Sequence, residues 1–109
     1  MAKAKVFSAK IKGLEWKFYA QAASSYVRKH GKDSHAITYT KDREVFFNIN
    51  TLAPEYVRHE LFHAYVASCS INSSSLDTEQ MEEVAAEIYG EHGPEMDLLV
   101  DQILNFFLR

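Results

Sequence analysis

The spacing of the apolar residues changes near residue 50, and this change most limits the folds open to the chain. Residues 35–50 alternate apolar and polar side chains on either side of a short polar turn at 41–43, which is the pattern of a β-hairpin. From Thr51 the signals are those of a helix, with Thr51 as a cap and Pro54 in the first turn, where a missing N–H costs little. We expect this helix to run to about Cys69, so the chain must combine a sheet with helices.

The amino-terminal third extends the same mixture. Residues 4–11 are predicted to form a first strand, and residues 14–29 a helix that stops at Gly31. The helix is inferred from apolar side chains that recur at helical spacing. These are Trp16, Tyr19, Ala20, Ala23 and Val27.

The carboxyl-terminal part is predicted to be helical after a serine-rich loop over 68–75. Asp77 is followed three residues later by Gln80, a capping pair for a helix that ends near Gly90 or Gly93, and Pro94 then opens a last helix. The expected order is β-α-β-β-α-α-α in one domain over 1–109. This is an α+β fold in which a small antiparallel sheet, made of the first strand and the hairpin, packs with about four helices.

Composition excludes several classes of protein. The net charge is −3, from 12 basic and 15 acidic residues, which argues against nucleic-acid binding by bulk charge. A single cysteine rules out an intramolecular disulfide. No apolar run approaches the length of about 20 residues that spans a bilayer, and no leader-like apolar stretch follows the first residues. We therefore expect a cytoplasmic protein with neither a membrane nor a nucleic-acid partner.

The helix after Thr51 contains the sequence His59-Glu60-Leu61-Phe62-His63, an H-E-x-x-H motif. Residues four apart lie on one face of a helix, so the two imidazoles can converge on one metal ion. Glu60 then sits beside the metal without binding it, where it can accept a proton from water that the metal has made acidic. The alternative is a polar helix face with two solvated histidines.

Two histidines leave a catalytic zinc ion one protein ligand short. Cys69 would lie on a different helix face from His63, and a buried thiol is the simpler interpretation of it. Glu83 and Glu87 lie one turn apart on the next predicted helix, so one carboxylate could bind the metal while the other accepts a hydrogen bond from His59. The alternative is a solvated acidic helix face, and Glu82 stays open as the ligand in place of Glu83.

The motif, followed by Glu83-x-x-x-Glu87-Ile88-Tyr89-Gly90, resembles the gluzincin metallopeptidases, the thermolysin-like branch. That family carries a glutamate ligand, an aspartate four residues on, and then an aliphatic residue, an aromatic residue and a glycine; here Glu87 stands in place of the aspartate. The size of the chain is similar to that of the single-domain minigluzincins. The resemblance implies a minimal zincin-like fold and a Zn²⁺ ion held by His59, His63 and Glu83.

The same resemblance implies further roles. Glu60 would be the general base, Glu87 would support a metal ligand, and His92 would steady the oxyanion, with Tyr89 or Tyr65 in reserve. A sheet edge just before the first zinc helix would bind the substrate backbone. The strand 45–50 is predicted to be this edge, with substrate-binding residues Phe46, Phe47 and Asn48.

Three functions follow from these observations. The first is a zinc-dependent endopeptidase that acts on a peptide or protein substrate. The second is a latent or inactive zinc-stabilised module that binds peptides without cleaving them, because 109 residues leave little chain for the second wall of a deep cleft. Its apolar end, 106–108, would dock on the site or on a neighbour, which makes the carboxyl-terminal helix a predicted oligomer contact. The third is an α+β domain without a metal.

Overall fold

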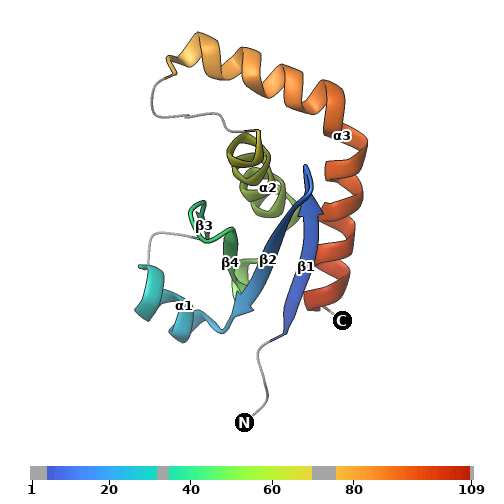
Figure 1. Cartoon of the computed structure of the whole chain (residues 1–109). Coiled ribbons are helices and arrows are strands. Elements are labelled where there is room, and N and C mark those ends of the chain that lie inside the picture. Colours follow the sequence, from blue (N-terminus) through green and yellow to red (C-terminus); the bar gives the residue numbers. More distant parts are fainter. Residues whose placement is uncertain (1–4, 32–34, 70–75, 109) are drawn as a thin grey trace.

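The chain forms a four-stranded mixed sheet with helices on both faces (Figure 1). The structure is a computed structural model that describes residues 5–31, 35–69 and 76–108. The strands are β1 (Val6–Ile11), β2 (Leu14–Gln21), β3 (Ala36–Tyr39) and β4 (Glu44–Asn48), in the spatial order β1-β2-β4-β3. The α+β class is thus confirmed, but β2 runs parallel to β4, so the sheet is not wholly antiparallel.

The predicted helix over 14–29 is wrong in its first half. Residues 14–21 form β2, which pairs with β1 through a two-residue turn in which Lys12 and Gly13 both have positive φ. That turn geometry matches the twist of a hairpin. Trp16 and Phe18 point into the core while Lys17 between them is exposed, which is the two-residue period of a strand. Only α1 (Ala23–His30) is helical, and it ends before Gly31 as expected.

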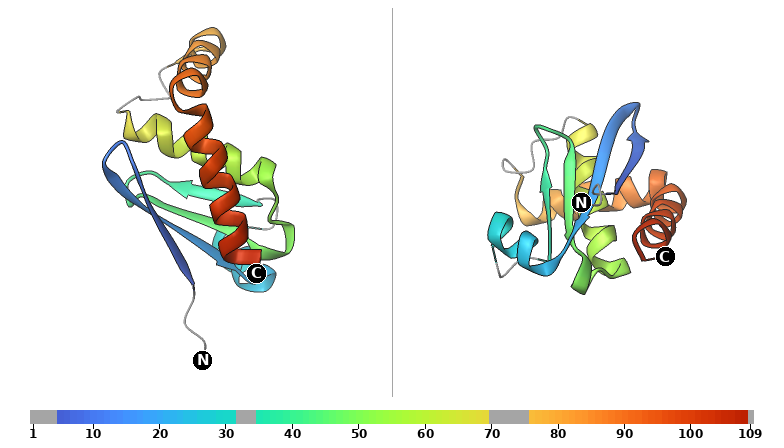
Figure 2. Two further views of the ribbon diagram at one scale, coloured as in Figure 1. Left: turned by 90° about the vertical axis from the view of Figure 1, so that its right-hand side faces the viewer. Right: turned by 90° about the horizontal axis from the view of Figure 1, so that it is seen from below.

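The hairpin over 35–50 is confirmed as β3 and β4. Successive residues of a strand point to opposite faces, and β4 buries side chains on both. Phe46 contacts the His30 ring of α1, whereas Val45 and Phe47 belong to the main core. The main core lies between the sheet and the two remaining helices, as Figure 2 shows.

The helix that carries the motif is α2 (Pro54–Ser68), close to the predicted range. Pro54 occupies its first turn, as expected, but the predicted cap is wrong: Thr51 ends a short 3-10 turn, η1 (Ile49–Thr51), and Ala53 stands at the N-cap without a side-chain bond. The Trp16 Nε1 donates to Ser68 Oγ at 2.8 Å, which fastens the end of α2 to β2.

The last two predicted helices are one, α3 (Thr78–Leu108), so the structure describes three α-helices and not four. The capping pair is confirmed, because Gln80 N–H donates to Asp77 Oδ1 and Asp77 N–H donates to Gln80 Oε1. Pro94 lies inside α3 and does not open it. Figure 1 shows α3 with a bend, and a proline within a helix is a usual cause of one.

Two further observations complete the fold. Ser68, the first residue of the predicted serine-rich loop, is the last residue of α2. Residues 70–75 of that loop and residue 4 of the predicted first strand lie outside the described residues. In the described part of the chain, no helix combines the length and the hydrophobicity that a membrane-spanning helix needs.

Candidate metal centre

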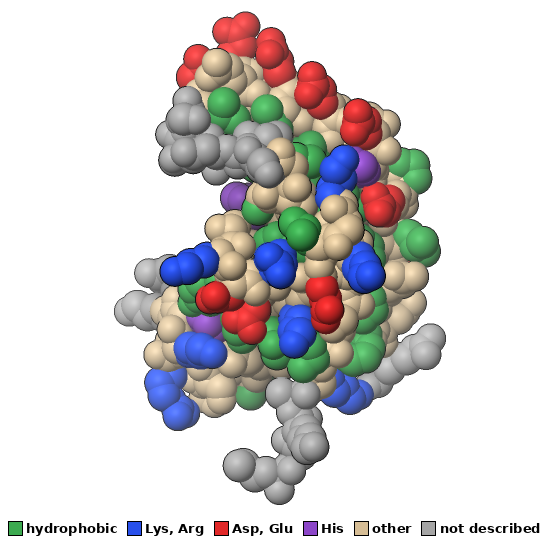
Figure 3. All heavy atoms as spheres, viewed as in Figure 1, with side chains coloured by type: hydrophobic (Ala, Val, Ile, Leu, Met, Phe, Trp, Pro, Cys, Tyr) green, Lys and Arg blue, Asp and Glu red, His purple; other side chains and the backbone are tan. Residues whose placement is uncertain are grey.

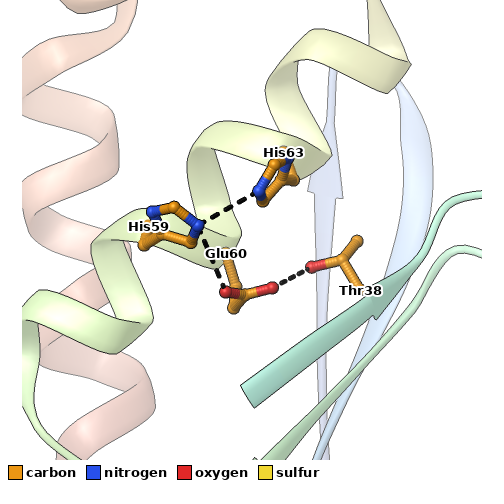
Figure 4. A network of polar contacts seen from close by, with 4 residues as sticks. All are labelled: Thr38, His59, Glu60 and His63. Carbon is orange, nitrogen blue, oxygen red and sulfur yellow. Dashed lines mark hydrogen bonds and ion pairs between the residues drawn. The ribbon is translucent and has the colours of Figure 1, made fainter. Parts of the chain in front are cut away.

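His59 and His63 face one another on α2, one helical turn apart (Figure 4). Their Nε2 atoms are 3.2 Å apart and the two rings are nearly perpendicular. Two ligand nitrogens at about 2.05 Å from a zinc ion, with a tetrahedral angle between them, lie about 3.3 Å apart. The pair therefore already has the spacing of two zinc ligands, and without a metal one ring N–H can donate to the other nitrogen.

Burial lowers the pKa of His63 below the ordinary value of 6.5 for histidine. The Glu60 carboxylate acts in the opposite direction, and His59 adds to the lowering. A neutral imidazole offers the lone pair that binds a metal, whereas a protonated one does not. The surroundings of His63 therefore favour the metal-binding form at neutral pH.

Glu60 is the one charged side chain among the buried residues that the structure describes, with 7% of its surface exposed. Its Oε1 accepts a hydrogen bond of 2.7 Å from Thr38 Oγ1 on β3, and its Oε2 lies 3.9 Å from His59 Nε2. Figure 4 shows the carboxylate between the strand and the histidine pair. A carboxylate in this place can take up a proton close to the atoms that would hold a metal.

A cavity of about 290 Å³ opens beside the motif, between α2 and β3. It is lined by Ala36, Ile37, Thr38, Thr40, His59, Glu60 and His63. Among the described strands β3 pairs with β4 alone, so it is an edge strand of the sheet. An extended peptide could add to such an edge as a further strand.

The strand 45–50, predicted to be the substrate-binding edge, is not an edge of the sheet. β4 is paired on both sides, with β2 and with β3, so it has no free edge. Phe46, Phe47 and Asn48 are buried, and none of them lines the cavity. Two adjacent aromatic residues in one strand were the signal for this, because they require both faces of the strand to be covered.

Glu83 is exposed on the first half of α3, and the structure does not bring it into the cavity beside the histidine pair. Among the described residues, no three His, Cys, Asp or Glu side chains are grouped so that they could hold a metal. Figure 3 shows acidic side chains along this part of α3, the pattern of a solvated face. Glu83 as the third ligand stays a prediction.

Glu87 and His92 line a separate cavity of about 140 Å³, which also includes Cys69. The His92 Nδ1 lies 3.1 Å from Glu95 Oε2, and its ring packs against Tyr65 with the centroids 5.0 Å apart. Within the described ranges no hydrogen bond joins Glu87 to His59. The structure thus unites three of the predicted site residues and leaves Glu83, Glu87 and His92 apart from them.

The two reserve residues for the oxyanion also lie elsewhere. Tyr89 stacks on Phe62, with ring centroids 5.9 Å apart, and Tyr65 is fully buried in the core. Neither lines the cavity beside the histidine pair. Burial raises the pKa of Tyr65, and the nearby Glu95 carboxylate adds to the rise.

Sequence reasoning missed Thr38. In the alternating hairpin strand, Ile37 and Tyr39 share one face, so Thr38 must point to the other, toward the helices. The same alternation predicts that Thr38, as the polar position between two apolar ones, faces solvent, so the pattern carries no signal for its contact with α2. Its partner lies 22 residues further along the chain, so only the folded structure identifies it.

Comparison with known proteins gives no match to this chain, whether among family models, curated proteins or solved structures. The resemblance to gluzincins therefore rests on the residue pattern alone and stays a prediction.

Proposed function

We propose that this chain is a zinc-dependent peptidase. The observation that carries the proposal is the imidazole pair at the spacing of two zinc ligands, with a buried carboxylate beside it. The pair lies on the wall of a cavity whose opposite wall is the edge strand β3. This combination supplies two metal donors, a proton acceptor and a backbone that can align a peptide. A peptide or protein is accordingly the proposed substrate.

His59 and His63 would hold the metal, and Glu83 is the proposed third ligand once the first half of α3 approaches the pair. A bound zinc ion makes water acidic and polarises a carbonyl group. Glu60 accepts the proton of the attacking water and passes it to the leaving amine nitrogen. The backbone of β3 aligns the substrate by main-chain hydrogen bonds.

Glu60→Gln tests this mechanism. The amide matches the carboxylate in size but is a very weak base, so we expect peptide hydrolysis to fall by about 10²- to 10⁴-fold. Zinc should stay bound, because Glu60 is not a ligand; elemental analysis of protein without a histidine tag measures this. The matched control is Glu55→Gln, an exposed glutamate in the first turn of the same helix, which should keep full activity. Full activity in Glu60→Gln would contradict the mechanism.

A second function, zinc-dependent peptide binding without cleavage, is favoured by one observation. Glu83 and His92 do not line the cavity beside the histidine pair, so the ligand set and the oxyanion contact are incomplete in this arrangement. Incubation with a mixture of proteome-derived peptides, read by mass spectrometry, separates the two functions. New termini that disappear on chelation support the peptidase, whereas zinc-dependent capture of uncut peptides supports the binding module.

Two further expectations accompany the proposal. A cytoplasmic location is one. An oligomer through the carboxyl-terminal helix is the other, and Leu98 and Leu108 are exposed apolar residues on that helix. In the structure, Phe106 packs edge-on against Phe7 of β1, with the centroids 5.5 Å apart, so the apolar end covers β1 and not the metal centre.

A further inference from the structure

We infer that Thr38 is a positioning residue for Glu60. Its hydroxyl ties one carboxylate oxygen to the edge strand and leaves the other oxygen free to accept the proton of the attacking water. The inference rests on the proposed peptidase function. Thr38 itself is assigned no contact with substrate or metal.

The two oxygens of Glu60 have different surroundings. Oε1 accepts the Thr38 hydroxyl at 2.7 Å, the length of a strong hydrogen bond to a carboxylate. Oε2 is the oxygen that faces the histidine pair, 3.9 Å from His59 Nε2. In the part of the chain that the structure describes, Thr38 is the one side chain that donates a hydrogen bond to Glu60. Without it, rotation about the last side-chain bond would exchange the two oxygens freely.

Thr38 is well placed to hold this geometry. It pairs with Val45 in the β3–β4 register, and Val45 is fully buried, so the backbone at Thr38 is fixed by the core. A β-branched side chain in a strand has few rotamers, which limits the directions in which its hydroxyl can point. The position of β3 therefore determines, through the Thr38 hydroxyl, where the Glu60 carboxylate lies.

This arrangement has a mechanistic consequence. The strand that would align the peptide also holds the general base. The positions of the scissile carbonyl and of the proton acceptor would therefore both be set by β3. A misplaced base harms the chemical step more than it harms binding. Loss of the hydroxyl should therefore lower kcat and leave KM nearly unchanged.

The test compares Thr38→Val, which keeps the shape of threonine, with Thr38→Ser, which keeps the hydroxyl. We expect kcat to fall by about 10- to 100-fold in Thr38→Val, with KM within about twofold, and to recover largely in Thr38→Ser. Thr78→Val is the matched control, since Thr78 is exposed at the start of α3, lies outside this cavity and is not the donor to Glu60. Zinc affinity should be equal in all three variants. An unchanged kcat in Thr38→Val, or a Thr38→Ser variant as slow as Thr38→Val, would overturn the inference.

A measurement on metal-free protein checks the contact independently of activity. Thr38→Val should lower the melting temperature by at least about 4 °C, because a buried carboxylate loses its donor. The same change made in the Glu60→Met background, where no acceptor exists, should have little effect. Equal shifts in both backgrounds would show that Thr38 does not act through Glu60. A wild-type protein that binds zinc and cleaves no peptide would overturn the proposed function and the catalytic role of Thr38 together. The comparison of melting temperatures in the two backgrounds would then still decide whether Thr38 holds Glu60.

Discussion

Zinc should stabilise the folded protein, because the histidine pair is formed before any metal arrives. The two Nε2 atoms are already 3.2 Å apart, so the imidazoles need no rearrangement to accept a common ion. Because the pKa of His63 is lowered, its imidazole is mainly neutral at pH 7, and zinc binding has little competition from protons there. Binding to the folded state therefore transfers directly into the free energy of unfolding.

The size of the effect follows from linkage. A ligand at 100 times its dissociation constant, bound only by the folded state, adds about 2.7 kcal/mol to the free energy of unfolding. For a domain of this size, that corresponds to a rise of about 12 °C in melting temperature. Thermal unfolding of untagged protein, followed during a zinc titration at pH 7, measures the rise and its dependence on concentration.

Three variants identify the ligands in the same assay. His63→Ala should abolish the rise, and Glu83→Gln should shift the titration to higher zinc concentration. Glu79→Gln is the matched control, because Glu79 is an exposed glutamate in the first turn of α3. A wild-type protein whose melting temperature does not respond to zinc would refute the metal centre. Equal titrations for Glu83→Gln, Glu79→Gln and wild type would refute Glu83 as the third ligand and leave the histidine pair intact.

Two further predictions concern stability. Tyr65 has a raised pKa in the folded state, so above the ordinary tyrosine pKa of 10.0 the unfolded chain loses a proton that the folded chain keeps. The free energy of unfolding therefore falls by up to about 1.4 kcal/mol per pH unit. Tyr65→Phe should remove this part of the alkaline loss in denaturant unfolding at pH 9 and 11, and an identical loss in both proteins would contradict the prediction. Asp77→Ala should lower the free energy of unfolding by about 1 kcal/mol, because α3 loses its cap, whereas Asp101→Ala, an exposed site on the same helix, should change it by less than about 0.5 kcal/mol. Equal effects of the two aspartate changes would argue against the cap.

Elements fixed by local chemistry were predictable from the sequence. The hairpin over 35–50 follows from alternation around a polar turn, and the capping pair at Asp77 and Gln80 follows from a short-range exchange of hydrogen bonds. The motif helix is equally local, because Pro54 and the apolar spacing act within a few turns. The geometry of His59 and His63 is a property of the helix itself, so it needed no knowledge of the rest of the fold.

The helix predicted over 14–29 shows where local patterns compete. Trp16, Phe18 and Ala20 fit a two-residue period as well as Trp16, Tyr19 and Ala20 fit a helical one. The deciding feature is the turn at Lys12 and Gly13, which returns the chain alongside β1 and gives β2 a hydrogen-bonded partner. The parallel pairing of β2 with β4 joins segments more than 20 residues apart, and no local signal specifies it.

Pro94 was assigned to the start of a helix because proline is well tolerated there. Inside a helix, proline removes one hydrogen bond and crowds the carbonyl group four residues earlier, here that of Gly90. Gly90 is exposed, so water can satisfy its carbonyl and the helix continues with a bend. A proline in the sequence therefore predicts a disturbance of α3 but not its end.

The uneven anchoring of α3 explains why the third ligand is harder to predict than the pair. Its buried residues are Met96, Leu99, Val100 and Ile103 in the second half, and Ile88 alone in the first. The first half, which carries Glu83, is therefore held to the core by much less apolar surface, and its position depends on how the bend directs it. The helical repeat of α2 fixes the spacing of His59 and His63. The distance from either to Glu83 depends instead on how α3 packs against α2, which the sequence pattern does not encode.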